Sequence, residues 1–232
     1  GYENSCKMLY MIKAVLFDMD GILYDSEYFY MQGTVAQMRA YGYDGPAKNI
    51  YRIIGTTMQK TYEMLYDMLD GKVPLEVIRE NNERYFNVEH PIHFKEIMFP
   101  GVPQALQQMK KMGLKLAVCS ASSYDLIVTS LKEMGILEYF DFIESGENCK
   151  RSKPYPDIYL LAQEALQVRK EECLVYEDSK AGIQAGISAG IRTVARIDNR
   201  FYQDQSKADI LVKDIHELTE LIRKENNYAG SN

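Results

Sequence analysis

Short apolar runs alternate with helical patterns over the carboxyl-terminal part of the chain. The runs have the length and the bounding turn residues of buried strands, and apolar residues recur at helical spacing between them. One further apolar run stands near the amino end. Because strands that alternate with helices form a parallel sheet, we predict an α/β fold. The predicted strands cover residues 14–18, 114–119, 140–144, 174–176, 193–195 and 210–212.

Between the first predicted strand and the others, the pattern is helical. Residues 26–87 contain little that is typical of a buried parallel strand, so a helical insert interrupts one sheet domain. We therefore predict a Rossmann-like parallel sheet core at 1–23 and 96–232, with a small helical domain inserted at 24–95 after the first strand. The predicted helices of the insert, separated by turns that contain Gly and Pro, cover residues 27–41, 57–69 and 75–86.

Composition and charge limit the classes of partner. The 232 residues are 46% hydrophobic and 26% charged, which is enough to bury a sizeable core. The net charge is -6 and no block of Lys or Arg stands out, so we expect neither a nucleic-acid nor an anionic membrane surface. No apolar stretch approaches the roughly 18 residues of a membrane helix. Small molecules are the expected partners, and of the oligomeric states, which the sequence does not determine, a monomer is slightly favoured.

The cysteines and the first residues of the chain favour a cytoplasmic protein. Cys6, Cys119, Cys149 and Cys173 stand at wide and irregular spacings, with no C-x-x-C pair, so we expect reduced thiols. The opening segment lacks the apolar core of a secretory signal.

Polar residues follow several of the predicted strands at the point where each strand ends. Asp18 and Asp20 follow the first strand, and Glu177 and Asp178 follow a later one. In an open parallel sheet these ends share one edge, so we expect the side chains to meet there. Carboxylates brought together repel one another unless a cation lies between them, and hard oxygen ligands suit Mg²⁺. The acids therefore predict a magnesium site, although the same residues also suit a simple turn or helix start.

A hydroxyl and an ammonium group supply hydrogen-bond donors that complement these acids. Ser120 follows the second strand with Ala121 and its backbone N–H groups, and Lys153 lies in a later loop. Such donors bind phosphate, so the combination indicates phosphoryl transfer. Asp18 is the candidate nucleophile, forming an aspartyl-phosphate, and Asp20 is the candidate general acid and base.

Taken together and in this order, the motifs resemble those of the haloacid dehalogenase superfamily and, within it, of the β-phosphoglucomutase-like phosphatase group, over about residues 12–223. The resemblance implies that Asp18 is phosphorylated, that Ser120 and Lys153 hold phosphate, and that the insert is a mobile cap. It also implies a Mg²⁺ ion held by Asp18, the Asp20 carbonyl and Asp178, with Glu177 assisting. The motifs that carry it are Asp18-x-Asp20-Gly21, Ser120 after an apolar strand, Lys153 in K-P-x-P-D-I-Y, and Glu177-Asp178-Ser179-x-Ala181-Gly182-Ile183.

The chain departs from the mutase branch of that group at its cap. Tyr30 stands where the mutases have a histidine, and Ile54 and Met58 stand where they have Lys and Arg. Without those cations the cap has little to hold a bisphosphate, so we predict hydrolysis of a small phosphorylated metabolite, with a sugar or polyol phosphate favoured.

Candidate contacts to the rest of the substrate are uncharged and rich in hydroxyl groups. They are Tyr30, Thr56 and Thr57 in the insert, which also suit packing or capping, and Ser122 in the sheet domain. Two alternatives stay open at this point. One is a phosphosugar mutase, and the other is a non-catalytic binding protein that keeps the fold.

Overall fold

The computed structural model describes residues 10–230, which form two compact units. The core unit comprises the described residues up to Tyr24, then Met98–Asp198, and the residues from Gln203 on. The helical unit comprises Asp25–Ile97 and a short later segment, Asn199–Tyr202.

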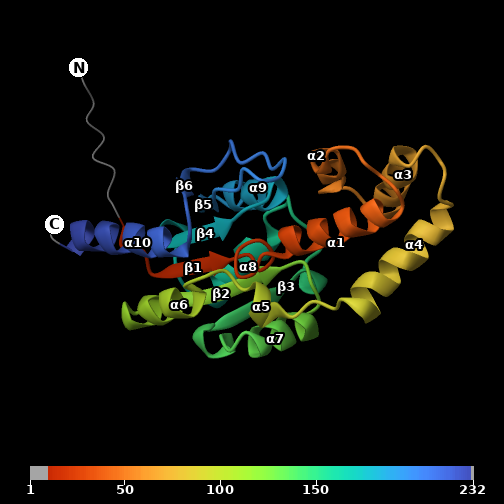
Figure 1. Cartoon of the computed structure of the whole chain (residues 1–232). Helices are drawn as coiled ribbons and strands as arrows, with labels where there is room; N and C mark the ends of the chain where they lie inside the picture. Colours follow the sequence, from red (N-terminus) through yellow and green to blue (C-terminus); the bar gives the residue numbers. More distant parts are fainter. Residues whose placement is uncertain (1–9, 231–232) are drawn as a thin grey trace, which may run out of the picture. The chain divides into compact units, whose positions relative to one another are not determined.

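The core unit is built on one parallel sheet (Figure 1). Its order is β3-β2-β1-β4-β5-β6, and every neighbouring pair is parallel. This is a doubly wound arrangement, in which the chain winds outward from the centre in both directions. The strands are β1 (Ala14–Phe17), β2 (Lys115–Ser120), β3 (Phe142–Ser145), β4 (Cys173–Glu177), β5 (Arg192–Arg196) and β6 (Ile210–Val212).

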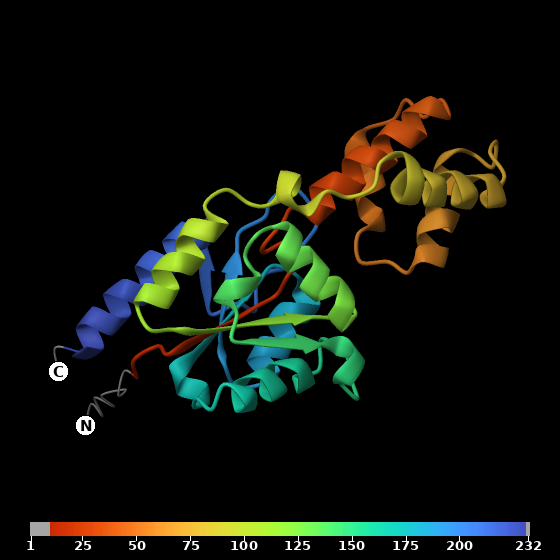
Figure 2. The same ribbon diagram turned by 90° about the horizontal axis from the view of Figure 1, so that it is seen from below.

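Helices cover both faces of this sheet. Figure 2 shows α6 and α10 side by side on the face opposite to α8. The helices of the core unit are α6 (Val102–Lys111), α7 (Tyr124–Glu133), α8 (Asp157–Ala165), α9 (Lys180–Ser188) and α10 (Ile215–Gly230).

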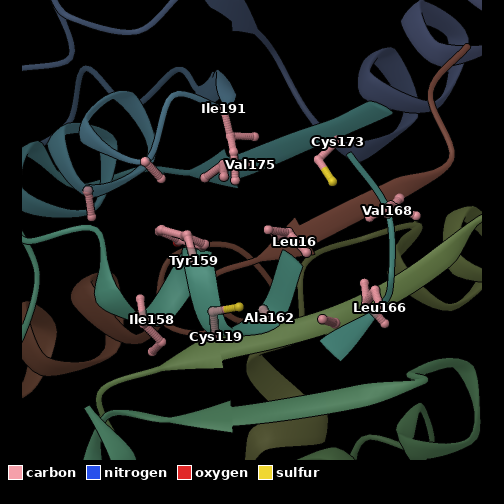
Figure 3. Packing of buried hydrophobic residues seen from close by; sticks show 14 residues of the cluster. Leu16, Cys119, Ile158, Tyr159, Ala162, Leu166, Val168, Cys173, Val175 and Ile191 are labelled. Carbon is pink, nitrogen blue, oxygen red and sulfur yellow. The ribbon is translucent and has the colours of Figure 1, made fainter. Parts of the chain in front are cut away.

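The central strands bury both of their faces, which explains why they have continuous apolar sequences. Ala14 and Leu16 of β1 point to the cluster formed with α8 and α9 (Figure 3), to which Val15 and Phe17 do not belong. Phe17 instead meets the rings of Phe140 and Tyr176 edge to face. The alternation therefore places β1 at the centre of the core, with its carboxyl end between those of β2 and β4.

The helical unit has a hydrophobic core of its own, formed by residues such as Met38, Ile50 and Leu65. Phe201 from the later segment is buried in this core, with its ring 5.2 Å from that of Tyr51. The helices of the unit are α1 (Ser26–Ala40), α2 (Ala47–Ile50), α3 (Met58–Met68), α4 (Leu75–Arg84) and α5 (Phe94–Ile97).

The predicted α/β class with a Rossmann-like parallel sheet is confirmed, and all six predicted strands are present within one or two residues at each end. Helix α4 ends at Arg84, where the sequence pattern predicted a helix to residue 86, because a π-helical turn, Tyr85–Glu89, follows it. Helices α2 and α5 were not predicted, since four residues are too few for a helical period to show. Along the described chain, no helix combines the length and the apolar character needed to cross a membrane.

Candidate active site

Three acidic side chains converge where β1 and β4 end. Asp18 directly follows β1, Glu177 is the last residue of β4, and Asp178 follows it. Asp18 is 9% exposed, Asp178 5% and Glu177 0%, and each offers a carboxylate oxygen within 4.8 Å of the others. The backbone N–H of Asp18 donates to the Tyr176 carbonyl at 3.0 Å, which extends the sheet ladder up to the site. Regular strand pairing therefore fixes where the acids lie.

Lys153 is the cation that faces these acids. Its Nζ donates to Glu177 Oε1 at 2.8 Å, to Asp18 Oδ1 at 3.0 Å and to the Cys119 carbonyl at 3.1 Å. All three donor hydrogens of the ammonium group are thereby used. One buried cation thus joins the ends of β1, β2 and β4.

The charges at this site perturb one another. Burial raises the pKa of Asp18 well above its usual value, and the carboxylate of Glu177 adds to this effect, while Lys153 opposes it. Burial by itself would lower the pKa of Lys153, but the charges of Asp18 and Glu177 outweigh burial and hold that pKa above its ordinary value. At Asp18, burial and the neighbouring acids therefore outweigh the attraction of Lys153.

Two glycines leave room for the acids. A Cβ at Gly21, whose φ is +75°, would lie 1.9 Å from Asp178 Oδ2. A Cβ at Gly182, in the first turn of α9, would lie 2.0 Å from Glu177 Oε1. The backbone therefore approaches both carboxylates so closely that no side chain fits at either position.

Asp20 lies in the turn after Asp18 and is exposed. The turn is closed by a hydrogen bond from the Gly21 N–H to the Tyr24 carbonyl at 3.0 Å. The Asp20 carboxylate is thus open to solvent, and its role as general acid and base stays a prediction.

The loop after β2 carries the predicted phosphate-binding residues. Ser120 is the buried last residue of β2, and its Oγ accepts a hydrogen bond from the Ser122 N–H at 3.2 Å. The Ser122 carbonyl in turn accepts from Ser145 Oγ at 2.6 Å, and Ala121 between the two serines is exposed. This bonding orders the loop beside the carbonyl that Lys153 contacts, although the phosphate-binding role itself stays a prediction.

The predicted residues of the insert make contacts inside the helical unit. The Tyr30 ring packs 5.4 Å from Phe29 and 5.1 Å from Phe86, and Thr56 Oγ1 donates to the Ile53 carbonyl at 2.6 Å. Thr57 is the N-cap of α3, and its side chain accepts from the Lys60 N–H. These contacts give each of the three residues a packing or capping role. A contact of these residues with substrate stays a prediction.

Sequence reasoning missed Tyr159, a fully buried residue of α8. Its hydroxyl donates to Glu177 Oε1, the same oxygen that accepts from Lys153, and Lys153 Nζ lies 5.1 Å from the centre of its ring. The other oxygen of Glu177 accepts from the Asp178 N–H at 3.2 Å. Tyr159 is the final residue of the K-P-x-P-D-I-Y motif, so the signal was present but had been assigned to Lys153 alone.

A Tyr159→Phe variant tests this contact. We expect the free energy of unfolding in EDTA to fall by about 2 kcal/mol, because a buried carboxylate loses a hydrogen-bond donor. Tyr176→Phe is the matched control, since the Tyr176 hydroxyl is also buried and has no hydrogen-bond partner in the described part of the chain. In urea unfolding, the free energy of unfolding of that control should fall little or rise. Equal losses in the two variants would contradict the role given to Tyr159.

The donor set fits a hard divalent cation. The three converging carboxylates are buried, and Lys153 pairs with two of them, Asp18 and Glu177. Oxygen ligands of this kind are those that Mg²⁺ takes in proteins.

Comparison with known proteins agrees with this geometry. Residues 15–196 match the sequence model of the haloacid dehalogenase-like hydrolase family. The chain is 34% identical to the phosphorylated carbohydrates phosphatase of Thermotoga maritima over 79% of this chain and 84% of that protein. It is 28% identical to hexitol phosphatase B of Escherichia coli, over 90% of this chain and 95% of that protein.

A solved structure shows the same likeness. The crystal structure of β-phosphoglucomutase from Clostridium difficile superposes with a TM-score of 0.64 and 25% identity, covering 96% of this chain and 100% of that one. The family match spans well over half of the chain and includes all the residues of the acid cluster. The chain therefore belongs to the haloacid dehalogenase-like hydrolase family and is an enzyme of its phosphatase type.

Proposed function

We propose that the protein is a Mg²⁺-dependent phosphatase that hydrolyses a small sugar or polyol phosphate through an aspartyl-phosphate on Asp18. The observation that carries this proposal is the set of hydrogen bonds from Lys153 to Asp18 and Glu177, with Asp178 beside them. A buried nucleophile, a buried cation and surplus carboxylates in one cluster match the needs of phosphoryl transfer.

Asp18, the Asp20 carbonyl and Asp178, with Glu177 assisting, would hold the metal in this proposal. When bound, Mg²⁺ would offset the charge of the phosphoryl group and of the acids around it. Lys153, together with Ser120 and the N–H groups of its loop, would bind the phosphoryl oxygens.

In the first step, an Asp18 carboxylate oxygen attacks phosphorus. The new O–P bond forms on Asp18 while the bond from phosphorus to the substrate oxygen breaks. Asp20 gives its proton to that leaving oxygen, so an alcohol departs rather than an alkoxide.

In the second step, water replaces Asp18 at phosphorus. The Asp20 carboxylate, now ionised, takes a proton from the water as its oxygen forms a bond to phosphorus. The bond from phosphorus to Asp18 then breaks, which releases phosphate and restores both acids. Dividing one displacement in two lets the same carboxylate serve as acid and then as base.

The substrate class rests on the uncharged contacts and on the relatives. Tyr30, Thr56, Thr57 and Ser122 offer hydroxyl groups rather than charges, which suits a polyol or sugar. Relatives named for phosphorylated carbohydrates and for hexitols point the same way. We also propose that the insert, residues 24–95, is a cap that closes over the substrate and excludes water.

We place this activity in the cytoplasm, on a small-molecule substrate. The described cysteines Cys119, Cys149 and Cys173 are free, as expected for a reducing compartment, while Cys6 and the opening segment lie outside the described residues. No partner other than the substrate is part of the proposal.

A screen of phosphorylated metabolites tests the function. We expect release of inorganic phosphate from several hexose and hexitol phosphates with MgCl₂, and none when EDTA is in excess. Phosphate release that persists in EDTA would contradict the metal requirement. Failure with every compound would contradict the proposed substrate class.

A phosphosugar mutase is the second candidate, favoured by the likeness to β-phosphoglucomutase. Incubation with β-glucose 1-phosphate and a trace of the bisphosphate separates the two. Accumulation of glucose 6-phosphate would support the mutase, and release of inorganic phosphate alone would support the phosphatase. Tyr30 stands at the position of the mutase histidine and packs against Phe29 and Phe86. This packing favours release of inorganic phosphate alone.

A further inference from the structure

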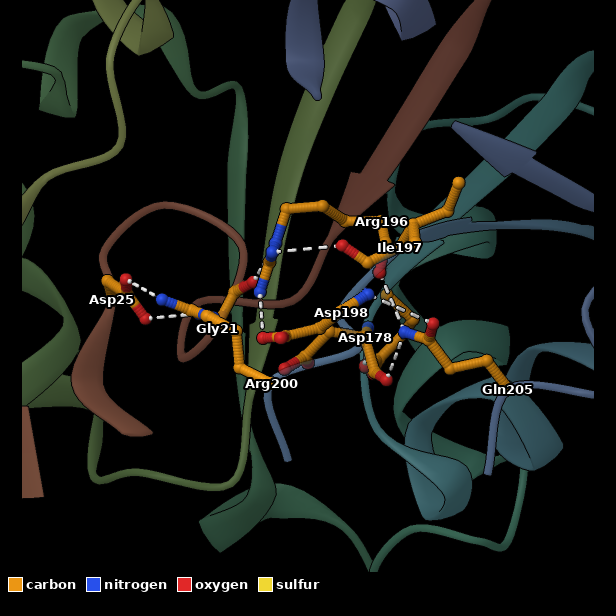
Figure 4. A network of polar contacts seen from close by, with 9 residues as sticks. Gly21, Asp25, Asp178, Arg196, Ile197, Asp198, Arg200 and Gln205 are labelled. Atoms are coloured by element: carbon orange, nitrogen blue, oxygen red, sulfur yellow. Dashed lines mark hydrogen bonds and ion pairs between the residues drawn. The ribbon is translucent and has the colours of Figure 1, made fainter. Parts of the chain in front are cut away.

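A polar network lies at the carboxyl end of β5, outside the residues assigned so far (Figure 4). Arg196, the buried last residue of β5, donates from Nε to the Gly21 carbonyl at 2.8 Å and from a terminal nitrogen to Asp198 Oδ2 at 3.1 Å. Its guanidinium carbon lies 4.4 Å from the centre of the Phe99 ring. The guanidinium group is therefore held on two sides by hydrogen bonds and against an aromatic ring.

Gln205 completes this network. Its Nε2 donates to the Asp178 carbonyl at 2.9 Å and to the Arg196 carbonyl at 2.7 Å, and its Oε1 accepts from the Asp198 N–H at 3.2 Å. Both amide hydrogens of the side chain and its oxygen are used. The side chain thus bridges the segment after β4 and the segment after β5.

Two of the backbone segments to which this network donates hydrogen bonds also carry candidate metal ligands. Gly21 directly follows Asp20, and the other anchored carbonyl belongs to Asp178 itself. Neither Arg196 nor Gln205 has a hydrogen bond to the Asp18 or Asp20 side chain among the contacts of the described residues. Their hydrogen bonds to these two segments instead go to the backbone carbonyls of Gly21 and Asp178.

Small displacements matter at this position. The closeness of Gly21 to the Asp178 carboxylate leaves no space for even one methyl group between them. A shift of either segment would change the distance between the Asp20 carbonyl and the Asp178 carboxylate, which the proposed function assigns to one metal ion. Partners that orient metal ligands in this way change metal affinity without touching the metal.

We infer that Arg196 and Gln205 are positioning residues that hold the Asp20–Gly21 turn and Asp178 in register for binding the metal. The inference rests on the proposed function, because it assumes that these segments bind Mg²⁺. The alternative is that the network only stabilises the connection between β5 and β6. Arg192 offers a matched comparison, since it is the first residue of the same strand and pairs with Glu225 of α10 at the other end.

The test compares Arg196→Met, Gln205→Leu and Arg192→Met. Thermal unfolding is followed over a MgCl₂ titration without substrate, and the concentration that gives half of the maximal rise in Tm is the readout. We expect this concentration to increase about tenfold in Arg196→Met and Gln205→Leu. Arg192→Met should lower Tm but keep the wild-type concentration. Phosphatase activity should show the same shifts in Mg²⁺ dependence.

The outcomes distinguish failure of the positioning role from failure of the proposed phosphatase function. Wild-type Mg²⁺ dependence in both network variants, with a lowered Tm, would show a structural role only and overturn the inference while leaving the phosphatase intact. A wild-type protein that Mg²⁺ does not stabilise and that releases no phosphate would refute the proposed function itself. If Arg196→Met does not fold, Gln205→Leu decides, since the half-buried Gln205 leaves a smaller gap.

Discussion

An Asp18→Asn variant is expected to lose at least about a thousandfold in kcat, the scale on which removal of a nucleophile acts in other enzymes. The amide has the shape of the carboxylate, so it keeps an oxygen for Lys153, but it does not attack phosphorus. The same variant should be more stable than the wild type in EDTA. Burial and the Glu177 carboxylate raise the pKa of Asp18, so its ionised form is unfavourable in the metal-free fold at neutral pH, and the amide removes that charge.

Three measurements check this prediction. Steady-state release of phosphate gives kcat, and thermal unfolding in EDTA and in MgCl₂ gives the stability. Rapid quenching with borohydride trapping, read by mass spectrometry, should place the label on Asp18 in the wild type and nowhere in the variant. Asp209→Asn is the control, because Asp209 accepts a hydrogen bond from the Thr193 N–H away from the acid cluster. Substantial turnover by Asp18→Asn, or a label on another residue, would refute the mechanism.

The sequence predicted those parts of the site that depend on strand periodicity. Asp18 and Glu177 end apolar strands, and parallel strands place their carboxyl ends at one edge, so their convergence follows from topology alone. Lys153 lies in a loop, so strand periodicity does not place it, and its charge and the family resemblance assigned it to the site. The structure shows why it belongs there, since its ammonium group bonds to two of those acids.

The residues that escaped prediction are those whose partners are distant in sequence and leave no periodic pattern. Gln205 bonds to Asp178 and Arg196 from a segment with no helix or strand, so nothing local marks it. Phe201 joins the core of the helical unit from beyond β5, where no helix or strand was predicted. Such contacts depend on the tertiary fold, and no local propensity encodes them.

The segment that carries Phe201 also contributes charge to the helical unit. Arg200 forms a two-pronged ion pair with Asp25, the residue before α1, at 2.7 and 2.9 Å (Figure 4). Asn199–Tyr202 therefore belongs to the helical unit by an ion pair as well as by packing. The chain passes between the two units at both ends of this segment, in addition to the two connections on either side of the insert.

Lys153→Met is the second variant for which we expect a large effect. Without the ammonium group, three buried carboxylates lose the cation bonded to two of them, and breaking a buried ion pair typically costs about 3–5 kcal/mol. We expect a loss of that size in the free energy of unfolding in EDTA. We also expect kcat to fall by at least about a hundredfold, because a preorganised donor to the phosphoryl group is gone.

Magnesium should partly restore the stability of this variant, and that response distinguishes charge balance from simple packing. Since Mg²⁺ supplies the missing positive charge, the rise in Tm between EDTA and saturating MgCl₂ should be larger in Lys153→Met than in the wild type. Lys150→Met, an exposed position in the same loop, should leave kcat and both Tm values unchanged. Lys153→Arg keeps the charge and should fold even if the Met variant does not, yet its larger planar group should not restore kcat. A Lys153→Met protein with wild-type kcat would contradict the role of Lys153 as a donor to the phosphoryl group. One with no added response to Mg²⁺ would show that the lysine does not balance the charge of the acids.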